Sequence, residues 1–201
     1  KKLRICMFVW KLRRIVNIMK KLVVIFPGVG YGFKHPLLYY ADLLYEAKGY
    51  ERKYMRYQDI CMDTKLTLEE KKVKVREYVF EQANGIDFKE YEEVIFLSKS
   101  IGTAEAGALA EKAGIKVTQI FLTPIERAIP YIKGGSNVVI GTGDEAYSVY
   151  KKHCEEHNIQ VLYIEEGDHS LEVQGEPYKN IDILKQVMQF VDEKSDLVAL
   201  N

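Results

Sequence analysis

Short apolar runs alternate with helical patterns along most of the chain, and this alternation constrains the fold more than any other feature. The short β-branched, apolar runs that predict strands are Leu22–Phe26, Val94–Leu97, Val117–Leu122, Val138–Ile140 and Ile159–Ile164, and a more polar run at Glu51–Tyr57 predicts a strand nearer the sheet edge. The patterns that predict helices are His35–Lys48, Leu68–Ala83, Gly102–Lys112, Glu145–Glu156 and Asp182–Glu193. Continuous apolar strands separated by helices indicate a parallel sheet covered on both faces. We therefore expect an α/β fold, a three-layer α/β/α sandwich with a mostly parallel sheet of about six or seven strands.

Residues 1–18 differ from the rest of the chain because they carry basic residues and no acidic ones. They lack the apolar core and small-residue cleavage site of a secretory signal. We expect this basic extension to be dispensable for the fold. An added edge strand through Leu3–Trp10, a transit peptide and a membrane-surface helix are the alternatives. Residues 19–201 are expected to form a single domain.

Composition excludes several classes of function. Hydrophobic residues make up 47% of the chain and charged residues 29%, which is typical of a globular protein. The formal net charge is zero, so electrostatics gives no reason to expect nucleic acid or an anionic membrane as a partner. Cys6, Cys61 and Cys154 form neither an even set nor a C-x-x-C pair, which indicates free thiols in a reducing, cytoplasmic compartment.

The segment Ser98–Gly102 lies between a predicted strand and a predicted helix, and its centre is Ser100. A serine at such a turn is typical of a nucleophile elbow, the motif G-x-S-x-G, in which the hydroxyl projects above the sheet. Here Ser98 replaces the first glycine. The alternative is that Ser100 is only a helix N-cap, whose hydroxyl accepts hydrogen bonds from the first turn.

A glycine-rich loop, Pro27–Gly32, follows the first predicted strand. Its G-x-G-x-G spacing lacks the third glycine position of a dinucleotide fingerprint and the G-K-[ST] of a P-loop, which argues against nucleotide binding. The competing interpretation is an oxyanion loop. In that case the N–H groups of Val29 and Ile101 are the two donors.

Two further loops at predicted strand ends carry an acid and a histidine. Asp144 follows the strand Val138–Ile140, and a helix N-cap is an equally good interpretation of its position. His169 follows the strand Ile159–Ile164. Asp168 is a rival to Asp144 as the acid, and His35 is a weaker rival base, better explained as local structure at the start of a helix.

Ser100, Asp144 and His169 occur in the chain order serine, acid, histidine, each at the carboxyl end of a predicted strand. This order is that of α/β-hydrolases and differs from the orders in chymotrypsin and subtilisin. From Leu22 to Glu193 the chain resembles small α/β-hydrolases without a cap domain, similar to dienelactone-hydrolase-like serine esterases. The resemblance rests on the loop Phe26–Gly30, the segment Ser98–Gly102, the turn Gly141–Asp144 and the segment Gly167–Ser170.

The resemblance implies an enzyme that cleaves a carboxylic ester, thioester or lactone of a small acyl substrate, without a cofactor. Ser100 would be the nucleophile, His169 the base and Asp144 the acid that orients it. Tyr31, Lys99 and Pro124 are predicted to contact substrate. The segment between Leu122 and Val138 is too short for a cap domain. The alternative function is that of a non-catalytic binding protein with the hydrolase fold.

A competing metal motif lies within the predicted helix Glu145–Glu156 and just beyond it. His153 and His157 complete the pattern H-x-x-E-H, and residues four apart share one face of a helix, where two imidazoles can hold one zinc ion. Its predicted place on a crossover helix, away from the strand ends, favours a solvated helix end instead. We therefore expect no metal site.

Overall fold

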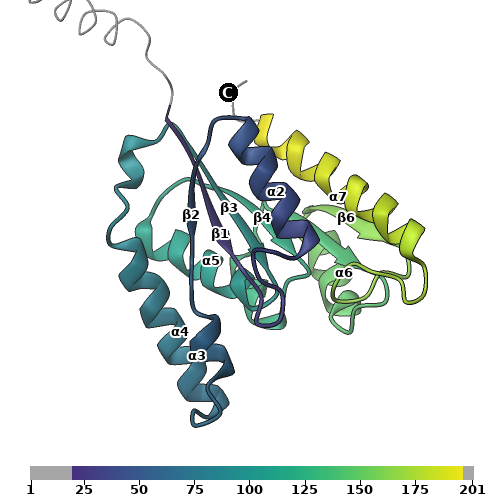
Figure 1. The fold of residues 1–201 in the computed structure, drawn as a ribbon, viewed down its shortest axis with the longest axis horizontal. Coiled ribbons are helices and arrows are strands. Elements are labelled where there is room, and N and C mark those ends of the chain that lie inside the picture. The colour runs from purple at the N-terminus through teal and green to yellow at the C-terminus, as the bar shows by residue number, and fades with distance from the viewer. Residues whose placement is uncertain (1–19, 197–201) are drawn as a thin grey trace, which may run out of the picture.

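The protein is described here by a computed structural model that covers residues 20–196 (Figure 1). The predicted basic extension, residues 1–18, lies outside the described residues, as do the alternatives for it. One six-stranded sheet runs through the described residues, and every neighbouring pair of strands is parallel. The strands are β1 (Lys21–Phe26), β2 (Glu51–Tyr54), β3 (Glu93–Lys99), β4 (Thr118–Leu122), β5 (Asn137–Gly141) and β6 (Gln160–Ile164). Their order across the sheet is β2-β1-β3-β4-β5-β6.

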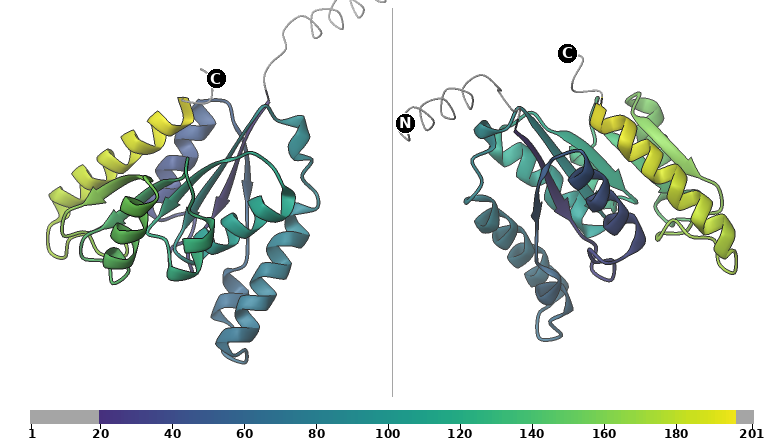
Figure 2. Two further views of the ribbon diagram at one scale, coloured as in Figure 1. Left: turned by 180° about the vertical axis from the view of Figure 1, so that it is seen from behind. Right: turned by 45° about the horizontal axis from the view of Figure 1, so that its top comes forward.

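Helices cover both faces of this sheet (Figures 1 and 2). The helices are α2 (Pro36–Ala47), α3 (Gln58–Met62), α4 (Leu68–Ala83), α5 (Ile101–Ala113), α6 (Tyr147–Glu156) and α7 (Pro177–Asp196), with short 3-10 helices η1 (Phe88–Glu90) and η2 (Glu126–Tyr131). Helices α2 and α7 lie side by side on one face, and α4, α5 and α6 lie on the other. The predicted three-layer α/β/α sandwich is therefore confirmed.

The core explains why the central strands read as continuous apolar runs. Successive side chains of a strand point to opposite faces of the sheet. In β1, Val23 and Ile25 pack beneath α2 and α7, whereas Leu22 and Val24 pack beneath α4 and α5. Every residue of β3 is buried. By contrast, the predicted polar strand is β2, which lies at the sheet edge with alternating exposed and half-buried residues.

The predicted elements are confirmed with differences at their ends. Helix α6 begins at Tyr147 instead of Glu145, because Asp144 opens a turn in which its carboxylate accepts the Ala146 N–H. Helix α7 begins earlier than predicted, at Pro177, a residue favoured in the first helical turn. Helix α3 was not predicted, since a single turn and a half has no visible apolar period.

The strand order creates a natural place for a site. The chain leaves β1 toward β2 on one side, then returns to β3 on the other side and continues outward to β6. In parallel sheets, ligands bind at the carboxyl ends of the strands beside such a change of direction. Ser100 lies there, directly after β3. Between β4 and β5 the chain forms only η2, so no cap domain is inserted there, as predicted.

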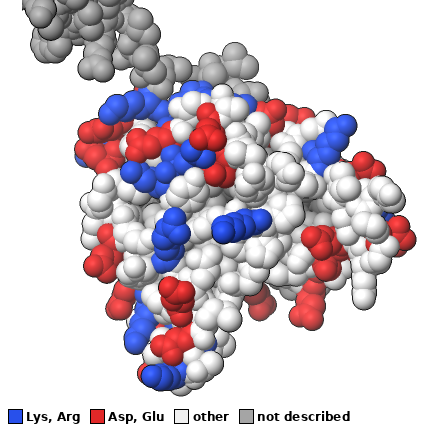
Figure 3. Space-filling model, in the orientation of Figure 1, with Lys and Arg blue, Asp and Glu red and all other residues white. Residues whose placement is uncertain are grey.

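The surface shows no single-sign field on the face formed by α2 and α7. In Figure 3 basic and acidic side chains are interspersed on this face, in keeping with the zero net charge. Within residues 20–196, each helix is too short or too polar to cross a lipid bilayer.

Candidate active site

Ser100 occupies a strained turn between β3 and α5, with φ 54° and ψ −123°. A residue with a side chain pays about 1–3 kcal/mol for such a conformation, so its surroundings must hold it there. The Ser100 N–H donates to the Leu122 carbonyl at 3.1 Å, and the Thr103 N–H and hydroxyl donate to the Ser100 carbonyl at 3.0 and 2.5 Å. Ser100 is the N-cap residue of α5, yet its side chain makes no capping bond. Its hydroxyl is therefore available to another partner.

The two small residues that flank Ser100 have different reasons to be small. A Cβ atom at Gly102 would lie 2.5 Å from the Phe26 carbonyl oxygen, so any side chain there would push α5 away from β1. Ser98 is buried, and its hydroxyl donates to the Ile120 carbonyl at 3.2 Å. Ser98 is thus occupied within the sheet.

His169 connects Ser100 to Asp144. Its Nε2 lies 2.9 Å from the Ser100 hydroxyl oxygen, and its Nδ1 lies 2.7 Å from Asp144 Oδ2. Asp144 also accepts the Ala146 N–H through Oδ1 at 2.9 Å, so it caps the turn and binds the imidazole at once. Asp168 instead accepts the N–H groups of Ser170 and Glu172, at 2.7 and 3.0 Å. The structure thus brings together the three residues that the sequence predicts at strand ends.

The environment of Asp144 favours its charged form. Burial by itself would raise the pKa of this carboxyl group. Hydrogen bonds from His169 and the Ala146 N–H, together with the charges of His169 and Lys99, outweigh burial and hold the pKa below its ordinary value. These contacts therefore favour the ionised form of Asp144, which is the form that accepts a hydrogen bond from the His169 ring.

Two glycines fix the loops that carry Asp144 and His169. A Cβ atom at Gly141 would lie 1.9 Å from the Gly167 carbonyl oxygen, so only glycine allows the loops after β5 and β6 to pack this closely. The Gly143 N–H donates to the same carbonyl at 2.9 Å. The separation of the acid and the histidine is therefore set by backbone packing.

The glycine-rich loop after β1 lies against Ser100. A Cβ atom at Gly28 would be 3.2 Å from Ser100 Cβ. The turn is held by the Gly28 N–H, which donates to the Tyr31 carbonyl, and by the buried Tyr57 hydroxyl, which donates to Pro27 O at 2.6 Å. Within residues 20–196, the N–H groups of Val29 and Ile101 donate no hydrogen bond to the chain. They are therefore unused donors close to the serine.

His35 takes the local role expected for it. It is the N-cap residue of α2, and its Nδ1 lies 3.0 Å from the Gly32 nitrogen, which donates to it. Its ring packs against Tyr31 with 4.6 Å between centroids. Tyr31 in turn accepts the Leu37 N–H through its phenol oxygen at 3.2 Å. Both rings therefore stabilise the start of α2.

Lys99 lies elsewhere than predicted. It is the last residue of β3, which is buried along its whole length, and only 1% of Lys99 is exposed. Its ammonium group donates to the carbonyl of His169 at 2.6 Å and to the Thr123 hydroxyl, and it lies 5.0 Å from the centroid of the Tyr31 ring. A side chain enclosed in this way cannot reach a substrate in solvent. The prediction that Lys99 contacts substrate is therefore wrong.

Two hollows adjoin the loop of His169. The larger, here called the Pro124 cleft, has a volume of about 500 Å³ and is lined by Pro124, Ile125, Glu126, Gly143, Asp144, Glu145, Ala146, Asp168 and His169. The smaller, the Tyr31 pocket, has a volume of about 130 Å³ and is mostly apolar, with Tyr31, Leu37, Leu171 and Leu184 in its wall. The predicted substrate contacts Pro124 and Tyr31 thus line two different hollows.

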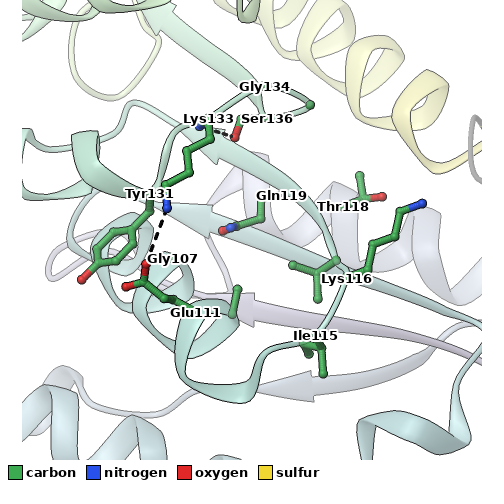
Figure 4. A pocket seen from close by; sticks show the side chains of 13 residues that line it. Gly107, Glu111, Ile115, Lys116, Thr118, Gln119, Tyr131, Lys133, Gly134 and Ser136 are labelled. Carbon is green, nitrogen blue, oxygen red and sulfur yellow. Dashed lines mark hydrogen bonds and ion pairs between the residues drawn. The ribbon is translucent and has the colours of Figure 1, made fainter. Parts of the chain in front are cut away.

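A further cavity of about 440 Å³ lies at the opposite, amino end of the sheet (Figure 4). Its wall includes Thr118 and Gln119 at the start of β4, and Lys133 faces Glu111 across it at 3.5 Å. This cavity shares no residue with the Ser100 site.

The histidines of the H-x-x-E-H pattern lie at the end of α6. Their rings stack with 4.3 Å between centroids, and His153 Nε2 lies 2.8 Å from the Ile132 carbonyl oxygen. In the part of the chain that the structure describes, no three His, Cys, Asp or Glu side chains are grouped to hold a metal ion.

Comparisons with known proteins place the fold. No protein-family model matches the chain, and no curated protein matches it. Among solved structures, Est1E from Butyrivibrio proteoclasticus with ferulic acid bound is 13% identical, with a TM-score of 0.64 and 91% of each chain covered. Dienelactone hydrolase from Anabaena variabilis is 16% identical, with a TM-score of 0.59, and covers 88% of this chain and 86% of its own.

A third solved structure points the same way. An alpha/beta hydrolase enzyme from a sediment metagenome of the Mar Chica lagoon is 14% identical, with a TM-score of 0.58, and covers 88% of this chain and 92% of its own. At such identities the likeness concerns the fold. This chain has the α/β-hydrolase fold, as the sequence resemblance predicts.

Proposed function

We propose that this protein is a serine hydrolase that cleaves an ester-type bond of a small substrate through an acyl-enzyme. One observation carries the proposal. A continuous chain of hydrogen bonds runs from the hydroxyl of Ser100 through both ring nitrogens of His169 to the carboxylate of Asp144. Ser100 is half-buried and His169 is 46% exposed in its side chain, so both can meet a substrate from solvent.

The first half of the reaction follows from this geometry. Ser100 Oγ attacks the carbonyl carbon of the ester while His169 Nε2 takes the hydroxyl proton. Asp144 holds the Nδ1–H tautomer and stabilises the imidazolium that forms. The N–H groups of Val29 and Ile101 donate to the oxyanion, and each such donor is worth about 10²–10³ in rate.

The second half returns the enzyme to its resting state. When the tetrahedral intermediate collapses, the acyl C–O bond of an ester or lactone, or the acyl C–S bond of a thioester, breaks, and His169 gives its proton to the departing alkoxide or thiolate. A water molecule then attacks the acyl carbon while His169 accepts its proton, and Ser100 leaves with that proton. Activity therefore requires a neutral imidazole and falls on acidification.

The charge of the Pro124 cleft narrows the substrate class. Its lining includes the exposed carboxylates Glu126, Glu145 and Asp168, and neither lysine nor arginine. An anionic group placed there meets like charges, so neutral or cationic esters are the expected substrates. Ferulic acid is the ligand of Est1E in one structure with this fold, which supports a small acyl group of similar size.

A fluorophosphonate probe, which phosphonylates activated serines, tests the proposal. Wild-type protein should be labelled, and Ser100→Ala should not. Ser98→Ala is the matched control because Ser98 is only two residues away but buried, and this variant should be labelled normally. A panel of short-chain aryl esters, thioesters and lactones, each in neutral and carboxylate-bearing form, then measures substrate preference.

The opposite results are equally informative. A wild-type sample that is folded by circular dichroism but takes up no label would contradict the proposal and favour a non-catalytic binding protein. Activity that survives Ser100→Ala but disappears with a chelator would point to metal catalysis instead.

A further inference from the structure

The ammonium group of Lys99 lies beneath the proposed active site and connects three of its loops. It donates to the main-chain carbonyl of His169 at 2.6 Å and to the hydroxyl of Thr123, in the turn after β4. It also lies 5.0 Å from the ring of Tyr31, in the glycine-rich loop after β1. A single buried group thus contacts the loops that follow β1, β4 and β6.

This cation has no carboxylate in direct contact among the described residues. Buried charges are normally paired, because transfer of an ammonium group from water costs several kcal/mol unless it is compensated. Here the compensation comes from two neutral oxygens, an aromatic face and the more distant charges of Asp144 and Asp168. The two hydrogen bonds therefore tie the ammonium group to the His169 main chain and to the Thr123 side chain.

We propose that Lys99 is a positioning residue, whose protonated side chain holds the main chain of His169 so that the imidazole stays against Ser100. The inference rests on the proposed hydrolase function. Lys99 touches neither substrate nor the reacting atoms. It acts through His169, and loss of its charge weakens the contact that aligns the ring, since hydrogen bonds from charged donors are roughly twice as strong as neutral ones.

The protonation of Lys99 is poised to change in mildly alkaline solution. Burial, the largest influence, lowers its pKa from 10.5 to about 8, against the attraction of Asp144 and Asp168. Of the other titratable groups that face it, Tyr31 remains neutral in this range because burial raises its pKa to about 12. The His169 ring is already neutral in the working form of the proposed site. Lys99 is thus the group that changes charge as the solution becomes alkaline.

The proposal predicts a second limb in the pH dependence of activity. The alkaline limb reports deprotonation of Lys99. Lys99→Met removes the contact with the His169 carbonyl. We expect the rate of fluorophosphonate labelling at neutral pH to fall about 10²-fold, the effect of a small displacement of a catalytic group. We also expect the alkaline limb to disappear.

Two further variants separate positioning from a general effect on folding. Lys99→Arg keeps a charge that does not titrate in this range, so it should restore part of the rate and move the alkaline limb to higher pH. Lys133→Met removes an exposed lysine at the opposite end of the sheet and should leave both the rate and the pH profile unchanged. Thermal melts establish that each variant is folded.

A readout independent of catalysis keeps the two proposals distinct. The imidazole NMR signals of His169 should show a second inflection near the pKa of Lys99 in wild-type protein and none in Lys99→Met. A wild-type protein that shows this inflection but takes up no label refutes the hydrolase function alone. If Lys99→Met keeps the alkaline limb of the labelling rate, or keeps the second inflection of the His169 signals, positioning by the Lys99 charge is refuted.

Discussion

Lys99 and Glu105 are two buried charged residues, one before and one after Ser100 in the sequence, and their surroundings differ. Glu105, in α5, is fully buried and forms ion pairs with Arg76 of α4 and Arg127 of η2. Lys99 is 1% exposed and contacts only neutral oxygens and an aromatic ring. The charge of Glu105 therefore has counter-ions in contact, and the charge of Lys99 has none among the described residues.

This difference distinguishes a charge with a structural role from a charge whose protonation can change with the pH of the solution. Glu105 joins α4, α5 and η2, because its carboxylate contacts the guanidinium groups of Arg76 and Arg127. Lys99 lacks such a partner, so burial moves its pKa into an accessible range. A buried charge without a counter-ion in contact, beside a candidate nucleophile, is the arrangement expected of a functional group.

The largest effect on stability should come from removing both arginine partners of Glu105. The double variant Arg76→Met with Arg127→Met leaves a buried carboxylate without its partners, which should lower the free energy of unfolding by about 3–5 kcal/mol. Adding Glu105→Met should restore most of that loss, because an apolar cluster replaces the ionic one. Urea unfolding monitored by circular dichroism measures both. If the double variant is as stable as wild type, Glu105 does not need its partners and the comparison fails.

Because of Lys99, stability and activity should change in opposite directions as the pH rises. Its pKa is about 8 in the folded chain and about 10.5 when unfolded, so the unfolded chain binds more protons between these values. The stability of wild type relative to Lys99→Met should therefore rise with pH across this range, by up to about 3 kcal/mol. Labelling of Ser100 should fall over the same range. Unfolding curves at several pH values measure the first trend, and a flat difference would contradict it.

Thr123 offers a smaller change at the same cation. Thr123→Val keeps the branched shape but removes one oxygen that accepts from Lys99, a loss of about 2 kcal/mol for a hydrogen bond to a charged group. The charged form of Lys99 is then less favoured, so the alkaline limb of the labelling rate should move to lower pH. Parallel pH profiles of wild type and variant measure the shift, and a limb at higher pH would be the contrary result.

The smallest effect is expected at the exposed pair between Lys133 and Glu111, which borders the cavity of Figure 4. Both side chains are more than half exposed, so Lys133→Met should change the free energy of unfolding by less than about 0.5 kcal/mol. A larger loss, measured by the same urea titration, would mean that the amino end of the sheet carries charge interactions of its own.

Sequence patterns predict this fold well because a strand that is buried on both faces has a continuous apolar sequence, which is easy to recognise. Runs such as Leu22–Phe26 have no polar side, and such runs are typical of central parallel strands when helical patterns lie between them. The loops that follow such strands meet at one edge, which is why Ser100, Asp144 and His169 were found together. Helix α3 escaped prediction because periodicity needs several turns.

Lys99 was misjudged for a physical reason. A lysine next to a candidate nucleophile is normally solvated, and sequence gives no sign of what covers it. The cover comes from Thr123 and His169, which lie far along the chain and enclose the ammonium group only after the sheet is assembled. One signal was available: the apolar run before it is buried on both faces, and a strand with that property buries its last residue as well.

The short η2 between β4 and β5 has a consequence for the acyl-enzyme of the proposed reaction. Within residues 20–196 no segment inserted at that point covers Ser100, which is half-buried, so we expect bulk water to have access to the acyl carbon of the proposed intermediate. Hydrolysis should then outcompete transfer of the acyl group to alcohols or amines, and product should escape without waiting for a lid to open. A segment inserted between β4 and β5 that shielded Ser100 from water would favour acyl transfer over hydrolysis with the same three side chains.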